Sequence, residues 1–233
     1  MSTHLTGFRI SIPSSSPKNV EIPRSRHASA RTRAAEVRRR LCHMLPGIVA
    51  LVLPLVPQPR PFALSDLVLI SIMIFVLGGV IRYGYAAIAR PGEVLWTTNV
   101  IKYCGTVIAM SFLFAWYPEF ATVVTAVLAF GDGSATIFGL LFGKHSLRWN
   151  AEKTSEGAVA FLFCSIPRAT MAYWLESQPT VPIPAAASCA CSVALCGQFA
   201  ETLPWKSSDN PRVGVAAAIG VVAGHLMVFG TLT

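Results

Sequence analysis

Hydrophobic residues occur in this chain as long runs, separated by short clusters of polar residues, proline and glycine. The seven runs, whose boundaries are soft, lie near 41–57, 64–82, 97–117, 120–142, 157–175, 184–203 and 213–231. A membrane helix needs about 20 mostly apolar residues. These runs lack the strict apolar–polar alternation of barrel strands, so helices are the spanning form that fits. The pattern therefore predicts an all-α, polytopic membrane bundle of about seven transmembrane helices over residues 34–233.

The first 33 residues follow a different pattern. They are rich in Ser, Pro and Arg and contain almost no acidic residue, a composition typical of disorder. No apolar stretch closely follows the first basic residues, which argues against a secretory signal, whereas an organelle transit peptide would have a similar composition. We expect residues 1–33 to form a disordered basic tail.

Composition supports a membrane protein. Hydrophobic residues make up 53% of the 233 residues, charged residues make up 13%, and the mean hydropathy is +0.56. Soluble domains carry about 25% charged residues. The net charge of +8 is concentrated before residue 41. In a membrane protein such a cluster is more typical of orientation by the positive-inside rule than of nucleic-acid binding, so we predict no nucleic-acid partner.

Loop charges predict the orientation. If the basic tail is cytoplasmic, three loops share its side, at 83–96, 143–156 and 204–212. Their cations are Arg90, Lys144, Arg148, Lys153, Lys206 and Arg212. The opposite loops hold the cation Arg60 and the acids Asp66, Glu119 and Glu176. This asymmetry predicts a multi-pass protein whose N-terminus and polar, active face are cytoplasmic. Arg168 lies within the fifth run, where it either snorkels to the far interface or pairs inside the bundle.

The strongest chemical signal begins inside the fourth run, at Asp132. A carboxylate there costs several kcal/mol unless it is paired or metal-bound. Gly131 and Gly133 flank it, which indicates a locally broken helix or the close approach of another group. Ala135, Gly139 and Gly143 then recur at helical spacing. Helix packing accounts for this face of small residues, but it does not account for Asp132.

Cations and a carboxylate follow in the next loop: Lys144, His145, Arg148, Lys153 and Glu156. Cations can neutralise the phosphates of a nucleoside triphosphate, and carboxylates can hold its magnesium ion. Taken alone, this loop is better explained as a solvated basic segment that obeys the positive-inside rule.

This stretch resembles the nucleotide-binding signature of the dolichol kinase and phytol kinase family. That signature reads Asp-x-x-Ala-x-x-x-Gly, followed by Lys-Lys-Thr-x-Glu-Gly. The matching residues here are Asp132, Ala135, Gly139, Lys153, Thr154, Glu156 and Gly157, while Glu152 stands where the family has its first Lys. The neighbouring Phe142-Gly143-Lys144-His145 is also similar to the family.

Two further segments extend the resemblance to roughly residues 36–213. Glu36, Arg39 and His43 fit the family's Glu-x-x-Arg-x-x-x-His pattern, although a basic cluster that binds anionic lipid would explain them equally well. Arg40 and His43 would share a helix face with Glu36. Near the C-terminus, Glu201 and the Asp209-Asn210 pair are similar to the family's late acidic elements. The alternative is a helix end followed by a turn.

The resemblance implies a kinase that uses CTP and Mg²⁺ to phosphorylate a polyprenol, dolichol or phytol-like alcohol. Metal ligands would be Asp132, Glu156 and Asp209, and phosphate contacts would come from Lys144, Arg148 and Lys153. Asp132 would be catalytic, and Glu36, His43 or Glu201 would orient or deprotonate the alcohol. Further nucleotide contacts are implied for Arg39, Ala135, Gly139, His145, Thr154, Glu156, Gly157 and Asn210.

Two other functions stay open. A CDP-lipid synthase of the phosphatidate cytidylyltransferase type shares a related Asp, Gly-Lys-His and Lys-Thr-x-Glu-Gly run. A non-catalytic lipid-binding or transport protein also carries buried acids and basic loops, although no repeated halves are evident here. Membrane lipids are the expected surroundings, and Gly- and Ala-rich packing faces permit a homodimer.

Overall fold

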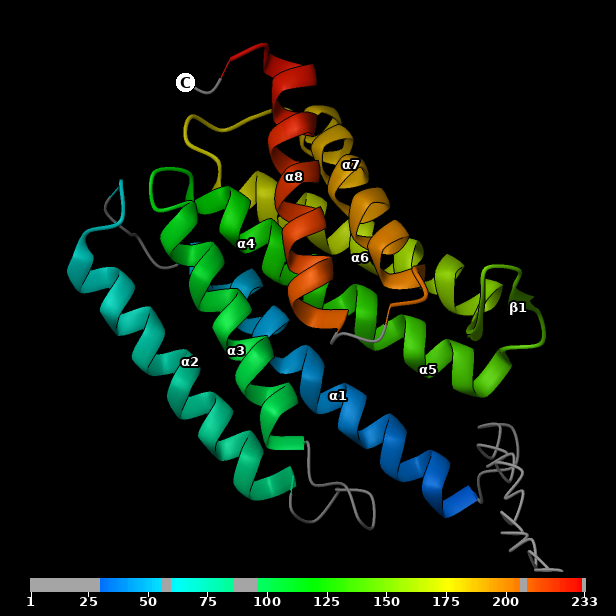
Figure 1. Ribbon diagram of the computed structural model, residues 1–233. Coiled ribbons are helices and arrows are strands. Elements are labelled where there is room, and N and C mark those ends of the chain that lie inside the picture. The colour runs from blue at the N-terminus through cyan, green and yellow to red at the C-terminus, as the bar shows by residue number, and fades with distance from the viewer. Residues whose placement is uncertain (1–29, 56–59, 86–95, 206–208, 232–233) are drawn as a thin grey trace, which may run out of the picture.

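The structure, a computed structural model, describes residues 30–55, 60–85, 96–205 and 209–231. The helices are α1 (Ala30–Val52), α2 (Leu64–Tyr85), α3 (Trp96–Leu113), α4 (Pro118–Ala126), α5 (Asp132–Phe142), α6 (Ser155–Glu176), α7 (Ile183–Thr202) and α8 (Asp209–Phe229) (Figure 1). A short turn of helix, η2 (Leu53–Leu55), follows α1. The strands β1 (Ser146–Leu147) and β2 (Asn150–Thr154) form an antiparallel hairpin that the sequence pattern did not predict. The all-α fold is otherwise confirmed.

Five helical segments of the described chain are long and apolar enough to cross a membrane: Leu64–Ile81, Pro118–Phe142, Ser155–Glu176, Ile183–Thr202 and Asp209–Phe229. This indicates a multi-pass membrane protein. The predicted runs 41–57 and 97–117 also form helices, α1 and α3, but these do not reach the apolarity of a span. The first half of α1 is strongly charged, and α3 begins with Asn99 and Lys102. Seven spans and the orientation of the N-terminus stay predictions.

The predicted tail ends earlier than residue 33, because α1 already begins at Ala30. Residues 1–29, which make up nearly all of that tail, lie outside the described residues, as do Arg90 and Lys206 in the predicted loops.

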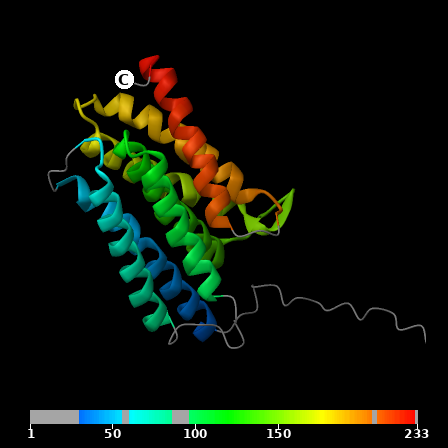
Figure 2. The same ribbon diagram turned by 60° about the vertical axis from the view of Figure 1, so that its left-hand side comes forward.

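The centre of the bundle is the span from Pro118 to Phe142, in which every residue from Pro118 to Ala135 is buried. Helices α1, α3, α6 and α8 pack against it, and α7 packs on α6 and α8. Helix α2 lies on the outside beside α3 (Figure 2). Because the central helix is enclosed, any charge on it must find its partner within the protein.

The central helix widens just before Asp132. Residues Val127–Gly131 form a π-helical turn, η3, which joins α4 to α5 without a break. A Cβ atom on Gly131 would lie 2.6 Å from the ring of Phe161, and one on Gly133 would lie 2.6 Å from Met44 Cε. The predicted close approach at these glycines is therefore confirmed, and the helix is widened rather than broken. Such π-turns are frequent at functional sites.

An ion cluster holds together the opposite end of the bundle. Arg60 lies 3.1 Å from Glu119 Oε2 and 2.7 Å from Glu176 Oε1, and it also donates to the backbone carbonyl of Glu176. The amide of Phe62 donates to the carbonyl of Ala115 at 3.0 Å. These contacts fix the segment before α2 against α3, α4 and α6.

Arg168 does not take part in this ion cluster. Its side chain is exposed, donates to the Cys164 carbonyl at 2.8 Å and lies 5.0 Å from the ring centroid of Phe130. The sequence left two alternatives, snorkelling to the interface or pairing inside the bundle. The contacts favour an outward-facing arginine that hydrogen-bonds to its own helix and lies over a neighbouring aromatic ring.

Candidate functional site

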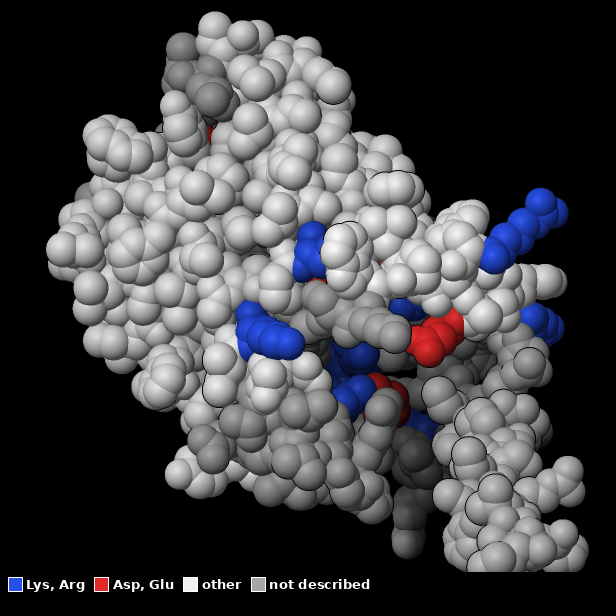
Figure 3. Space-filling model, viewed as in Figure 1, with Lys and Arg blue, Asp and Glu red and all other residues white. Residues whose placement is uncertain are grey.

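Helices α1, α2, α3, α5 and α8 line a pocket of about 270 Å³, the polar pocket, to which α2 contributes only apolar residues. Charged side chains gather around a hollow on this part of the surface, while most of the visible face is uncharged (Figure 3). The polar residues that line the pocket are Arg39, Arg40, His43, Asn99, Tyr103, Asp132, Asp209 and Asn210. Segments far apart in the sequence thus meet at one place.

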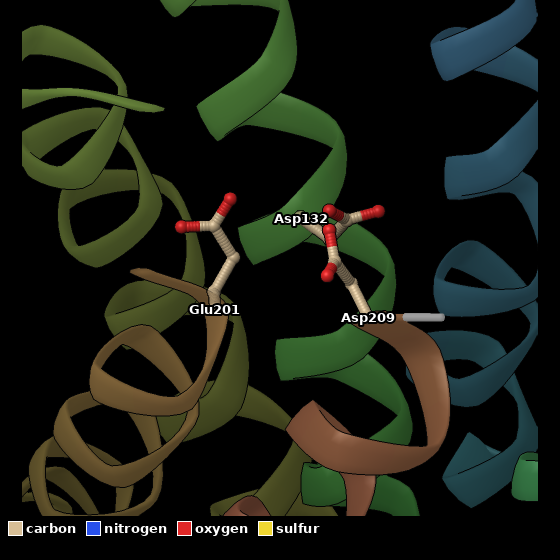
Figure 4. Close-up of side chains that lie close together, drawn as sticks. All are labelled: Asp132, Glu201 and Asp209. Atoms are coloured by element: carbon tan, nitrogen blue, oxygen red, sulfur yellow. The ribbon is translucent and has the colours of Figure 1, made fainter. Parts of the chain in front are cut away.

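Three carboxylates come together beside this pocket, from the start of α5, the end of α7 and the start of α8 (Figure 4). One oxygen each of Asp132, Glu201 and Asp209 lies within 4.8 Å of the other two. Asp132 and Glu201 are 1% and 2% exposed, whereas the Asp209 side chain is 32% exposed. Like charges this close repel one another strongly in a low dielectric. The group therefore requires cations.

Helix α1 supplies the cations for Asp132. Arg40 Nη1 donates to Asp132 Oδ2 at 2.6 Å, and His43 Nε2 lies 3.3 Å from the same oxygen. Arg40 also lies 3.5 Å from Glu36, which is paired with Arg39. The sequence-based expectation that one face of this helix carries these groups is confirmed.

The second carboxylate oxygen of Asp132 hydrogen-bonds with neither Arg40 nor His43. Oδ1 is buried and has no hydrogen-bond partner among the described residues. An unpaired buried carboxylate oxygen costs free energy, and a carboxylate that lies beside two others is a suitable ligand for a hard divalent cation. The donor set therefore fits Mg²⁺, which prefers carboxylate oxygen and completes its shell with water and substrate phosphate.

Lys153 neutralises the other two carboxylates. Its ammonium group contacts Glu201 and lies 3.0 Å from Asp209 Oδ2. Burial alone would lower the pKa of Lys153, but the two carboxylates outweigh it and raise the pKa above its usual value. Lys153 therefore stays charged at neutral pH. Arg212 adds a contact of 2.8 Å to Asp209 Oδ1.

Glu156, the third expected metal ligand, lies outside this group of Asp132, Glu201 and Asp209. Thr154 caps α6 by accepting a hydrogen bond from the Gly157 amide, which places Glu156 in the first turn of that helix. There Glu156 Oε1 lies 2.7 Å from His145 Nδ1 and also faces the His145 amide. Glu201, which the sequence assigned to the acceptor alcohol, lies where Glu156 was expected.

Several residues of the motif pack helices rather than line the pocket. A Cβ atom on Gly157 would lie 2.7 Å from the carbonyl oxygen of Ala135, and one on Gly139 would lie 3.0 Å from Thr154 Oγ1. Lys144, His145 and Arg148 are exposed on the hairpin, and none of them lines the polar pocket. The hairpin is instead tied to α7, because Asn150 donates to the Thr202 carbonyl at 3.1 Å.

Tyr103 is a pocket residue that the sequence analysis missed. Its hydroxyl is buried without a hydrogen-bond partner in the described part of the chain, and its ring centroid lies 4.3 Å from that of His43. Tyr103 follows the pocket residue Asn99 by four positions. Their shared helix face was the available signal.

Comparisons of the chain with protein-family models, with curated proteins and with solved structures found no match.

Proposed function

We propose that this protein is a CTP-dependent lipid-alcohol kinase that phosphorylates an isoprenoid alcohol at the cytoplasmic face of a membrane. The observation that carries the proposal is the group Asp132, Glu201 and Asp209, in which a buried oxygen of Asp132 has no partner within the described residues. A buried metal-binding carboxylate group beside cations, at one end of a membrane bundle, suits transfer between a charged nucleotide and a lipid.

Asp132, Glu201 and Asp209 would hold one or two magnesium ions, whose charge would offset that of the triphosphate. Lys153 lies within reach of the same carboxylates and contacts phosphate oxygens when nucleotide is bound. The choice of CTP as donor rests on the motif resemblance. The inference that the N-terminus and the pocket are cytoplasmic rests on the loop charges, and the inference that α1 and α3 complete a set of seven membrane helices rests on the hydrophobic runs.

The reaction is a displacement at the γ-phosphorus. The alcohol oxygen forms a bond to phosphorus, the bond to the β,γ-bridging oxygen breaks, and CDP leaves with the electron pair. The hydroxyl proton needs an acceptor. Glu36 is engaged by Arg39 and Arg40, and Glu201 is engaged by Lys153. We therefore assign proton acceptance to His43, which lines the pocket next to Asp132.

The test uses purified protein in detergent with magnesium, γ-labelled CTP, and a panel of isoprenoid alcohols and phosphatidate. The kinase proposal predicts label in a lipid phosphate together with unlabelled CDP. Labelled pyrophosphate that appears only with phosphatidate would instead identify a CDP-lipid synthase. Nucleotide binding without transfer to any lipid would favour a non-catalytic lipid-binding protein.

A further inference from the structure

An apolar groove adjoins the polar pocket. It has a volume of about 430 Å³ and lies between α1 and α2, with α3 and the start of α4 as its floor. Pro46, Ile74 and Leu77 line both the groove and the polar pocket. A molecule in the groove can therefore present one end to Asp132 and His43.

The groove offers no free polar group to its occupant among the described residues. The three hydroxyls in its lining donate to carbonyl groups of their own helices, Ser111 to Val107 at 3.0 Å, Thr122 to Pro118 at 2.7 Å and Thr125 to Ala121 at 2.8 Å. With these groups satisfied, the groove matches a chain that has no polar atoms, since a polar occupant would lose its own hydrogen bonds to water.

One side of the groove is open to the outside of the bundle. Ile72, Val76 and Val80 line it and are 54%, 57% and 63% exposed. Helix α2 packs more extensively against α3 than against α1, so the α1–α2 side is the weaker seam. At the far end the buried Phe62 closes the groove, two residues after Arg60 in the ion cluster.

The junction of groove and pocket is suited to an uncharged head group. On the pocket side, Tyr103 offers a buried hydroxyl that has no hydrogen-bond partner among the described residues, beside the ring of His43. The nearby cations Arg39 and Arg40 are already engaged by Glu36 and Asp132. A hydroxyl group would pair with Tyr103, whereas a lipid phosphate would compete with two carboxylates for the same guanidinium groups.

We propose that this groove binds the single apolar chain of a neutral lipid alcohol, which enters sideways from the bilayer between α1 and α2 and places its hydroxyl at Tyr103 and His43. This inference rests on the proposed kinase function and specifies its acceptor: a one-chain alcohol rather than a two-chain anionic lipid.

The test is photolabelling in detergent, without nucleotide, by a long-chain primary alcohol that carries a diazirine in its chain. Labelled peptides are expected from α1 and α2, and unlabelled alcohol should compete whereas phosphatidate should not. Val76→Trp fills the mouth of the groove and should weaken labelling about tenfold, by displacing about two methylene groups of the chain. The matched control is Val159→Trp on α6, where the valine is 66% exposed and lies outside the groove lining.

A second variant tests the head group. Tyr103→Phe keeps the ring but removes the hydroxyl, so affinity for the alcohol should fall about fivefold, as for one lost hydrogen bond. Affinity for the corresponding hydrocarbon, which has no hydroxyl, should not change. A structural role of Tyr103 would weaken both ligands equally.

Labelling that is spread over α6 and α8 and is insensitive to Val76→Trp would overturn the proposal that the groove binds the alcohol. Equal competition by phosphatidate would overturn the neutral head group. Since labelling needs no nucleotide, groove labelling without phosphoryl transfer would remove the kinase proposal and leave the groove. If Val76→Trp leaves phosphoryl transfer unchanged, the kinase proposal stands, but the groove is not the binding site of the acceptor.

Discussion

Neutralising Asp132 while keeping its shape is the sharpest test of the carboxylate group. Asp132→Asn removes one unit of charge from a side chain that is 1% exposed. Two unit charges about 4 Å apart interact by about 4 kcal/mol at an effective dielectric constant of about 20. Each 1.36 kcal/mol is about a tenfold change in rate, so turnover should fall about a thousandfold. Asp209→Asn should cost less, because solvent screens a side chain that is 32% exposed.

The assay is the initial rate of phosphate transfer to lipid over a range of magnesium concentrations, with wild-type protein beside both variants. Glu152→Gln serves as a control, because Glu152 is an exposed carboxylate of the hairpin and is not one of the three. It should retain wild-type activity. Thermal unfolding in detergent must show that Asp132→Asn is folded. A folded Asp132→Asn protein with turnover within tenfold of wild type, and the same magnesium dependence, would refute the metal-ligand role.

Three further substitutions have outcomes that the structure predicts. Arg60→Met leaves two buried carboxylates uncompensated and should cost about 3–5 kcal/mol of stability, seen as a lower unfolding temperature in detergent, whereas Arg168→Met at an exposed arginine should change little. Gly131→Ala puts a Cβ atom against a fully buried ring and should cost about 1–3 kcal/mol, while Gly79→Ala meets no atom within 4 Å and should be neutral. Lys153→Met removes the cation between two carboxylates, so Mn²⁺ binding measured by electron paramagnetic resonance should tighten about tenfold as CTP binding weakens. Equal weakening of both ligands would contradict the assigned role of Lys153.

The apolar spans were predictable because the hydrophobic runs are long and the solvent is lipid. The runs that became α4 to α8 read as helices from composition alone. The hairpin was not predicted, because its strands Ser146–Leu147 and Asn150–Thr154 are too short for the alternation of polar and apolar residues in this loop to stand out. Contacts distant in sequence, such as that of Asn150 with the Thr202 carbonyl, hold it in place.

The sequence pointed to those residues of the candidate site whose charge lies within or at the end of an apolar run. Asp132 and Glu201 stood out because carboxylates at the ends or middle of apolar runs need partners. Which carboxylates meet could not be read from the chain, since Glu156 lies closer in sequence to Asp132 than Glu201 does, yet Glu201 is the one that joins it. Tyr103 was missed because an aromatic residue in a helix is ordinarily a packing residue.

The partners of the ion pairs described above are synthesised in a consistent order. In each pair that joins two different segments of the chain, the cation precedes the carboxylate in sequence. These pairs are Arg40 with Asp132, Arg60 with Glu119 and Glu176, and Lys153 with Glu201. Ribosomes make the N-terminal residues first, so each acid that reaches the bilayer meets a partner that has already been synthesised. These four carboxylates would therefore enter the bilayer after a cation that can pair with them has been made.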